Sequence, residues 1–425
     1  MAPKSRIIID TDAGGDDIIA ILLALTASAE DIEILLLSVV WGNVNVDKGL
    51  KTIVSLFHIA KLEMRWREAR GVDVGFDSLR AYRPVVAVGA AGALGSEEVF
   101  KDDGFHGPDG VGGFHTTHPH LSPPDTWKHP FDVTQPRPSQ GQVPSYFKYF
   151  TPATTPAHKE ILRILKTEPA GTVTVCSMGP MTNMALAAVE DPETFLRMKD
   201  LLVMGGAVDA PGNITTVVEA NIWNDALAAA RVFALTSKRP EFTTPVCMRG
   251  DFHPYPENLP PTLDLKLFPL DITSKHYVDY SRFREVVGTQ IKEDSPLATF
   301  VDTFLAAIHR KVRFQYGDNA SANLVLHDGL TVWYALTAGS QSPAWALAPD
   351  APEDIRVATT EEWTHGMTVV DRRKKRRADG VNETEIPGDS LGWLSSVRGN
   401  RVNVVVGSPG GEAYHEAILG RLFGV

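Results

Sequence analysis

Short apolar runs alternate with longer amphipathic stretches along this chain of 425 residues. Residues 7–9 form a β-branched run that ends at a glycine-containing turn, which predicts a buried strand. Residues 18–25 are rich in Leu and Ala and predict a buried helix. Further strand-like runs occur at 84–89, 172–179 and 201–207. This alternation predicts an α/β fold with a mostly parallel central sheet and Rossmann-like helices around it.

Two segments interrupt the pattern without dividing the chain, so we expect a single domain over residues 1–425. Residues 114–150 are rich in Pro, His, Ser, Thr and Gln with little periodicity, and they predict a surface insertion or lid. The run RRKKRR at 372–377 belongs to a basic loop over about 372–388. We interpret it as a solvated loop between two strands, and a nuclear-localisation signal is the alternative.

The first candidate for chemistry is the segment that joins the first predicted strand to the first predicted helix. Its sequence DTDAGGDD places Asp10, Asp12, Asp16 and Asp17 within eight residues. In an open α/β sheet, such a loop lies at the carboxyl end of the strand, where ligands bind. A helix N-terminus stabilises one or two carboxylates, whereas four of them repel one another unless a cation is present. The loop therefore predicts a site for a hard divalent ion.

Charge and cysteine content narrow the class of protein. The chain has 41 basic and 52 acidic residues, a net charge of -11, which argues against nucleic acid as the main partner. Two cysteines are too few for a disulfide framework or a zinc motif, and a reducing compartment fits best. We find no signal-type segment before the first strand and no apolar run of membrane-spanning length. These features predict a cytoplasmic protein without a membrane partner.

Several short motifs, taken together, resemble one enzyme family. DTDAGGDD is similar to the DTDPGxDD signature of the calcium-dependent, inosine-uridine preferring nucleoside hydrolases, with Ala13 where that family usually has Pro. Other family-like segments follow in the expected order: WGN (41–43), HGPDGVG (106–112), GPMTN (179–183), MGGA (204–207), GNITTVVEAN (212–221), FPLDIT (268–273), HD (327–328) and HGMTVVD (365–371). The resemblance covers nearly the whole chain and implies the nucleoside hydrolase fold.

The resemblance also implies an activity and a cofactor. Members hydrolyse the N-glycosidic bond of ribonucleosides to free base and ribose, with a calcium-bound water as nucleophile. Carried over to this sequence, the calcium ligands are the carboxylates of Asp12, Asp17 and Asp328 and the backbone carbonyl of Met178. Six to eight oxygen ligands suit calcium, and substrate hydroxyls and water would complete the set.

Roles in catalysis follow from the same resemblance. Bond cleavage builds positive charge on the ribose and negative charge on the base. Asp12 is then the general base, His327 the general acid, and His106 a second histidine of the base pocket. The remaining candidates resemble the residues that hold the ribose: Asp16, Asn43, Met204, Asn213, Glu219 and Asn221. We expect an extended segment at 217–221 that turns Glu219 and Asn221 to one face.

Two other functions remain open at this point. The opening motif also resembles that of haloacid dehalogenase-type phosphatases, with Asp10 as nucleophile and Asp12 as acid-base over magnesium. A non-catalytic nucleoside-binding homologue is the second alternative. Relatives are usually homodimers or homotetramers, so we expect a homo-oligomer whose only other partner is its small-molecule substrate.

Overall fold

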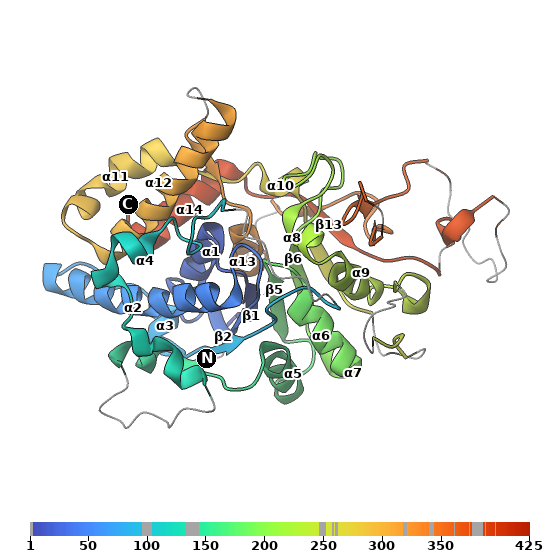
Figure 1. Cartoon of the computed structure of the whole chain (residues 1–425), viewed down its shortest axis with the longest axis horizontal. Coiled ribbons are helices and arrows are strands. Elements are labelled where there is room, and N and C mark those ends of the chain that lie inside the picture. Colours follow the sequence, from blue (N-terminus) through green and yellow to red (C-terminus); the bar gives the residue numbers. More distant parts are fainter. Residues whose placement is uncertain are drawn as a thin grey trace.

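The computed structural model describes residues 3–95, 104–132, 144–245, 252–256, 259, 262–317, 321–339, 344–360, 362–373, 375, 386, 388–395 and 397–425. Within these ranges, nine strands form one sheet in the order β10-β13-β7-β6-β5-β1-β2-β3-β4. Neighbours pair in parallel, except that β10 runs antiparallel to β13. Figure 1 shows the helices on both sides of this sheet. The predicted α/β fold with a mostly parallel central sheet is confirmed.

The strands of the main sheet and of two small antiparallel pairs, β8-β9 and β11-β12, are β1 (Ser5–Thr11), β2 (Ile32–Val39), β3 (Val85–Val88), β4 (Thr151–Pro152), β5 (Val173–Ser177), β6 (Asp200–Met204), β7 (Leu265–Phe268), β8 (Tyr277–Asp279), β9 (Asn323–Val325), β10 (Ala346–Leu347), β11 (Arg356–Val357), β12 (Thr368–Val369) and β13 (Asn403–Gly407).

The α-helices are α1 (Gly15–Leu25), α2 (Val46–Arg70), α3 (Asp77–Ala81), α4 (Phe114–Thr117), α5 (Ala157–Thr167), α6 (Thr182–Glu190), α7 (Pro192–Phe195), α8 (Ala220–Asn224), α9 (Ala226–Ala234), α10 (Leu270–Thr273), α11 (Tyr280–Lys292), α12 (Pro296–Tyr316), α13 (Gly329–Thr337) and α14 (Gly411–Phe423). Short 3-10 helices are η1 (Pro119–Leu121), η2 (Asp125–Phe131), η3 (Ser145–Tyr149), η4 (Pro240–Phe242) and η5 (Ser390–Gly392). Among the described helices, none combines the length and apolarity needed to cross a bilayer.

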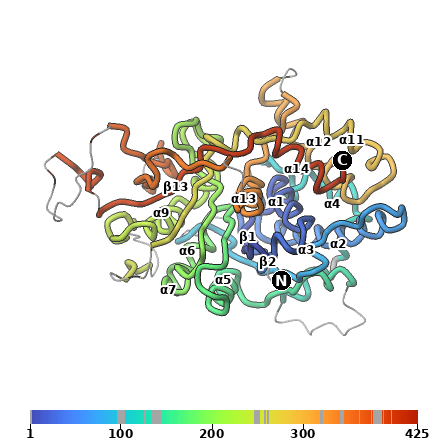
Figure 2. The backbone as a smooth tube through the Cα atoms, turned by 180° about the vertical axis from the view of Figure 1, so that it is seen from behind, coloured from blue at the N-terminus to red at the C-terminus, as the bar shows by residue number. Residues whose placement is uncertain are grey.

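Apolar side chains form one core on each face of the sheet. Ile7 and Ile9 of β1 pack with α1, α2 and α12, whereas Ile8 packs with α5, α6 and α9. This division follows from the two-residue period of a strand, which sends successive side chains to opposite faces. Figure 2 shows, from behind, α1, α2 and α14 on one side of the molecule and α5, α6 and α9 on the other. A strand that is buried on both faces needs the continuous apolar run seen in β1.

The first strand and helix lie close to their predicted positions. β1 is longer than residues 7–9 at both ends, and α1 begins at Gly15 rather than at residue 18. Asp16 and Asp17 therefore lie in the first turn of α1, where the positive end of the helix dipole favours them. The predicted strands at 84–89, 172–179 and 201–207 correspond to β3, β5 and β6.

The predicted insertion at 114–150 contains short helical turns in its described parts, with residues 133–143 outside them. α4, η2 and η3 carry the buried aromatic side chains Phe114, Trp127, Tyr146 and Phe147. These side chains join the core that contains α2. The described parts of the segment are thus anchored by aromatic burial, although its composition is polar.

The basic run at 372–377 follows β12, and Arg372, Arg373 and Lys375 are its described residues. Arg372 pairs with Asp209, and Arg373 pairs with Asp371. The guanidinium of Arg373 lowers the pKa of Asp371 to about 2. These pairs fit the interpretation of a solvated loop, and the targeting role stays an untested alternative.

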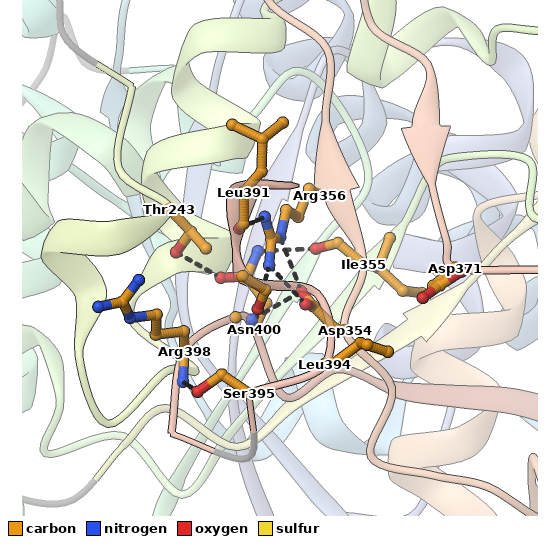
Figure 3. A network of polar contacts seen from close by, with 12 residues as sticks. Thr243, Asp354, Ile355, Arg356, Asp371, Leu391, Leu394, Ser395, Arg398 and Asn400 are labelled. Carbon is orange, nitrogen blue, oxygen red and sulfur yellow. Dashed lines mark hydrogen bonds and ion pairs between the residues drawn. The ribbon is translucent and has the colours of Figure 1, made fainter. Parts of the chain in front are cut away.

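A buried polar network holds the irregular C-terminal part of the chain (Figure 3). The Asp354 carboxylate accepts hydrogen bonds from Arg356 Nη2 at 2.8 Å and from the backbone N–H of Asn400 at 2.9 Å. Asn400 Nδ2 donates to the Ile355 carbonyl at 2.7 Å, and Arg356 Nη1 donates to the Leu391 carbonyl at 2.8 Å. Buried polar groups satisfied in this way fix backbone that has little regular structure.

Candidate active site

Segments far apart in the sequence converge on one acidic cluster beyond the carboxyl end of β1. One carboxylate oxygen each of Asp16, Asp17 and Asp328 lie within 4.8 Å of one another, and all three residues are buried. Asp16 and Asp17 come from the segment after β1, and Asp328 precedes α13. Asp328 is more than three hundred residues from the others in sequence, so only the fold brings the three together.

Burial and the charges of neighbouring carboxylates disfavour the charged form of Asp12, Asp17 and Asp328. Both causes raise the pKa of Asp17 to about 6 and raise the pKa of Asp12 and of Asp328 well above the usual range. Asp16 Oδ1 is buried without a hydrogen-bond partner among the described residues. A cluster of buried oxygen ligands with an unpartnered oxygen is suited to a hard divalent cation.

Hydrogen bonds from neighbouring groups fix the orientation of the Asp12 and Asp17 carboxylates. Asp12 Oδ2 accepts a hydrogen bond from the Asn43 N–H at 2.7 Å, and Asp12 Oδ1 accepts one from Asn43 Nδ2 at 2.9 Å. Asp17 accepts hydrogen bonds from Thr11 Oγ1 at 2.6 Å and from the Gly14 N–H at 2.9 Å. Both carboxylates are therefore oriented before any ligand binds.

Two histidines lie beside the acidic cluster in different hydrogen-bonding environments. His327 Nδ1 lies 2.8 Å from Thr273 Oγ1, and the His327 N–H donates to Asp16 Oδ2 at 3.2 Å. The Gly15 N–H donates to His106 Nδ1 at 3.2 Å. Burial lowers the pKa of His327, the Asp16 carboxylate opposes this shift, and His106 adds to it.

A second group of candidates lies where β5 and β6 end. Asn221 Nδ2 donates to the Met178 carbonyl at 2.9 Å and contacts the Met204 carbonyl at 3.3 Å. Met178 is joined to the acidic loop because its N–H donates to the Asp10 carbonyl at 2.9 Å. Asn213 is exposed, and its Oδ1 accepts a hydrogen bond from the Ala220 N–H at 2.9 Å.

The expected extended segment at 217–221 is wrong, because α8 begins at Ala220. Glu219 is the N-cap of this helix, and its carboxylate accepts hydrogen bonds from the N–H groups of Asn221, Ile222 and Gly206. A carboxylate that binds three backbone donors stabilises the helix start and ties it to the MGGA turn. Glu219 and Asn221 are thus placed by a helix cap.

Some supporting residues carried no predicted role. Asp271 accepts hydrogen bonds from the N–H groups of Val208, Asp209 and Ala210 at 2.7 to 3.0 Å. Thr368 Oγ1 bonds both backbone groups of Ala207. Asp271 belongs to FPLDIT and Thr368 to HGMTVVD, so these motifs were the available signal. Both residues hold the turn that follows β6.

With this geometry in place, comparison with known proteins decides the family. The model of the family described as inosine-uridine preferring nucleoside hydrolase matches residues 7–406. The chain belongs to this nucleoside hydrolase family. The predicted family is confirmed. The chain is thus a nucleoside hydrolase, an enzyme that hydrolyses ribonucleosides.

Individual members of the nucleoside hydrolase family are similar in sequence or fold. Pyrimidine-specific ribonucleoside hydrolase RihA of Salmonella paratyphi B is 28% identical over 377 residues, covering 86% of this chain and 88% of RihA. The structure of a purine-preferring ribonucleoside hydrolase from Gardnerella vaginalis aligns with a TM-score of 0.64 at 18% identity, over 99% of this chain and 98% of that one. An inosine-guanosine nucleoside hydrolase aligns with a TM-score of 0.62 at 21% identity, over 98% of both chains.

The phosphatase alternative has no support in this nucleoside hydrolase. Asp10 would have to be an accessible nucleophile, but its side chain is fully buried. Its Oδ1 accepts hydrogen bonds from Ser38 Oγ and from Asn183 Nδ2. Burial raises the pKa of Asp10 to about 7. Asp10 therefore supports the acidic loop through its buried hydrogen bonds to Ser38 and Asn183.

Ala13 departs from the nucleoside hydrolase signature and has an unusual backbone. Its φ is 60°, in the left-handed region, and its N–H donates to Thr11 Oγ1 at 3.0 Å. Proline requires φ near −65° and has no N–H. The acidic loop of this chain therefore has a backbone conformation that the usual proline cannot adopt.

Restoring the family proline with Ala13→Pro is expected to be harmful. The substitution forces φ to change sign and removes the hydrogen bond to Thr11, so we expect a loss of stability of about 3 kcal/mol or more. Ala13→Gly tolerates the observed φ and is the matched control. Thermal unfolding of both variants is the measurement, and an Ala13→Pro variant as stable as the control would contradict this account of the loop.

Proposed function

We propose that this enzyme hydrolyses ribonucleosides with a water activated at a calcium site built by the acidic loop. The buried carboxylate cluster of Asp16, Asp17 and Asp328 is the observation that carries the proposal. The residues that would hold calcium are Asp12, Asp17, Asp328 and the Met178 carbonyl. When bound, calcium would fix the ribose 2′- and 3′-hydroxyls with a water molecule and lower the pKa of that water.

Asp12 is the general base of the proposed reaction. Both of its oxygens accept hydrogen bonds from Asn43, which orients the carboxylate. The bond from the Asn43 N–H partly offsets the rise in the pKa of Asp12 that burial and Asp17 cause. An oriented carboxylate beside the ribose can take the proton of the attacking water as the new C–O bond forms. Asp16 Oδ1 has no partner among the described residues, so it would accept a hydrogen bond from a ribose hydroxyl.

The two histidines act differently on the departing base. The Gly15 N–H can only donate, so His106 Nδ1 is the acceptor of that bond and leaves Nε2 to face the base. His106 then serves as a hydrogen-bond donor of the base pocket. Thr273 Oγ1 can donate or accept, so His327 keeps its hydrogen bond in either protonation state. His327 is therefore the better general acid.

The residues around α8 are proposed to bind the ribose of the substrate. Asn221 bridges the turns after β5 and β6, and Glu219 fixes the start of the helix that carries Asn221. Together with Asn43, Met204 and Asn213, they form the proposed ribose-binding set. Polar groups held in this way align the sugar with the base and acid, which contributes through orientation.

Removing the substrate 5′-hydroxyl is expected to lower kcat/KM of the unmodified enzyme by about 10 to 100-fold, since misplacement of the sugar is costly. Glu219→Ala is expected to remove this preference, because the helix cap that positions the ribose contacts is lost. Hydrolysis of uridine or inosine and of the 5′-deoxy analogue by both proteins is the measurement. Equal rates for both substrates with the unmodified enzyme would refute the role of this set.

The decisive experiment is a panel of ribonucleosides incubated with the purified protein, followed by separation of the free bases. Release of base and ribose is the expected result. Pyrimidine-specific and purine-preferring proteins are both among the relatives, so the panel also determines base preference. Binding without base release would instead support the non-catalytic homologue.

We also propose a cytoplasmic enzyme that forms a homodimer or homotetramer. The low cysteine content supports the location. Light scattering of the purified protein measures the assembly state, and a monomer would contradict this part of the proposal.

A further inference from the structure

Tyr414 lies behind the His327–Asp328 pair and comes from the last helix of the chain. It belongs to the first turns of α14 and has no exposed surface. α14 packs against α1, whose first turn carries Asp16 and Asp17, and against β8. Figure 1 shows α14 close to α1 and α13.

The hydroxyl of Tyr414 touches the chain on both sides of the His327–Asp328 pair. Tyr414 Oη lies 3.5 Å from the Leu326 carbonyl. A Cβ placed on Gly329 would lie 1.8 Å from Tyr414 Oη and 3.0 Å from Tyr414 Cζ. The hydroxyl therefore occupies the space that any side chain at residue 329 would need.

The backbone alone does not require glycine at position 329. Gly329 begins α13, and it is absent from the glycines of positive φ. An α-helix disfavours glycine by about 1 kcal/mol relative to alanine, so the residue is costly unless space demands it. The Tyr414 hydroxyl fills this space, so only glycine fits at position 329.

The Tyr414 hydroxyl lies close enough to the acidic cluster for the charges of Asp16 and Asp328 to affect its pKa. Burial, followed by the negative charges of Asp16 and Asp328, raises the pKa of Tyr414 well above its usual range. The side chain is thus a neutral phenol, which can donate a hydrogen bond without adding charge to the cluster.

We propose that Tyr414 is a positioning residue of the active site, whose hydroxyl is seated on Gly329 and fixes the backbone that presents His327 and Asp328. This inference rests on the proposed function, because it assigns those two residues to proton transfer and calcium binding. Loss of a contact that orients a metal ligand typically lowers metal affinity or activity by about 10- to 100-fold.

Three variants test the contact: Tyr414→Phe, Gly329→Ala and the double variant. Gly329→Ala puts a methyl group where the hydroxyl lies, and we expect calcium affinity and kcat/KM to fall by about 10 to 100-fold. Tyr414→Phe should lose about 10-fold in both. In the double variant the atom 1.8 Å away is gone, and the ring carbon Cζ at 3.0 Å has to shift only slightly, so both values should rise most of the way to those of Tyr414→Phe.

Matched controls separate positioning from general packing. Tyr334→Phe removes the hydroxyl of a different tyrosine, which is partly buried and lies in α13. Gly288→Ala adds a methyl group where no atom lies within 4 Å. Calorimetric titration with calcium chloride, base release and thermal unfolding are measured for each protein. We expect both controls to match the unmodified enzyme in calcium affinity and base release, and Gly288→Ala to be at least as stable, because a helix favours alanine over glycine.

The outcomes are distinguishable. If Tyr414→Phe lowers the unfolding temperature but leaves calcium affinity and kcat/KM unchanged, Tyr414 only packs and the inference is overturned. If Gly329→Ala does not fold, Tyr414→Phe and the double variant still decide. If the unmodified enzyme binds no calcium, the proposed metal site is wrong, and base release by Tyr414→Phe at unchanged stability still tests whether Tyr414 positions His327.

Discussion

Replacing Asp17 with alanine is expected to abolish measurable calcium binding and to lower kcat/KM by at least about 100-fold, more than the loss of a typical second-shell contact. The side chain lies at the centre of the cluster, beside Asp12, Asp16 and Asp328. Its removal takes away one predicted ligand and leaves Thr11 Oγ1 and the Gly14 N–H without their acceptor. Calorimetric titration with calcium and a base-release assay are the measurements.

Asp77→Ala is the matched control for Asp17→Ala. Asp77 lies in the first turn of a helix, as Asp17 does, but its side chain is exposed. We expect this variant to bind calcium and to hydrolyse nucleosides normally. An unmodified enzyme that ignores chelators and binds no calcium would show that the acidic cluster has another role.

Replacing His327 with alanine is expected to slow hydrolysis of natural nucleosides by about 100 to 10,000-fold, the usual range for a general acid. A p-nitrophenyl riboside should lose far less, because its leaving group is stable as an anion and needs little protonation. Asp12→Ala should harm both substrates equally, since each needs an activated water. Steady-state rates on inosine, uridine and the nitrophenyl compound are the measurement.

His106→Ala provides the comparison within the same pocket. His106 Nδ1 accepts a hydrogen bond from the Gly15 N–H, which leaves Nε2 for the base. We therefore expect His106→Ala to weaken base binding and to raise KM more than it lowers kcat. A His327→Ala variant with near-normal rates on inosine would move the acid role to His106. Equal losses on natural and nitrophenyl substrates would indicate a collapsed site rather than a missing proton.

Local patterns were sufficient to predict the centre of the sheet. The β-branched run of β1 and the Leu-rich run of α1 gave the first strand and helix, and the acidic loop between them was placed correctly. The predicted start of α1 was three residues late, because Gly15, Asp16 and Asp17 lack an apolar pattern. The expected extended segment near Glu219 was wrong because a helix cap, which involves tertiary contacts to Gly206, overrides local propensity.

The composition of the active site was harder to predict than the sheet. Asp328 and His327 were found only through the resemblance to a family, because no spacing rule connects them to Asp17. Thr273, whose Oγ1 lies 2.8 Å from His327 Nδ1, and Tyr414 have no predicted role, since an isolated hydroxyl or phenol has no pattern of its own. Gly329, a glycine at the start of a helix, was the one local sign of Tyr414, and its meaning depends on a partner 85 residues away.

The packing of α1 has a consequence for how the chain folds during synthesis. Every residue of this apolar helix is buried, and α13 and α14 are among the elements that cover it. About 300 residues separate α1 from the start of α13, which corresponds to roughly 15 to 60 seconds of translation at ~5–20 residues per second. During that interval the nascent chain exposes α1 and the acidic loop without their final partners. The burial of α1 is therefore complete only after the C-terminal helices emerge from the ribosome, and the N-terminal part of the chain carries exposed apolar surface until then.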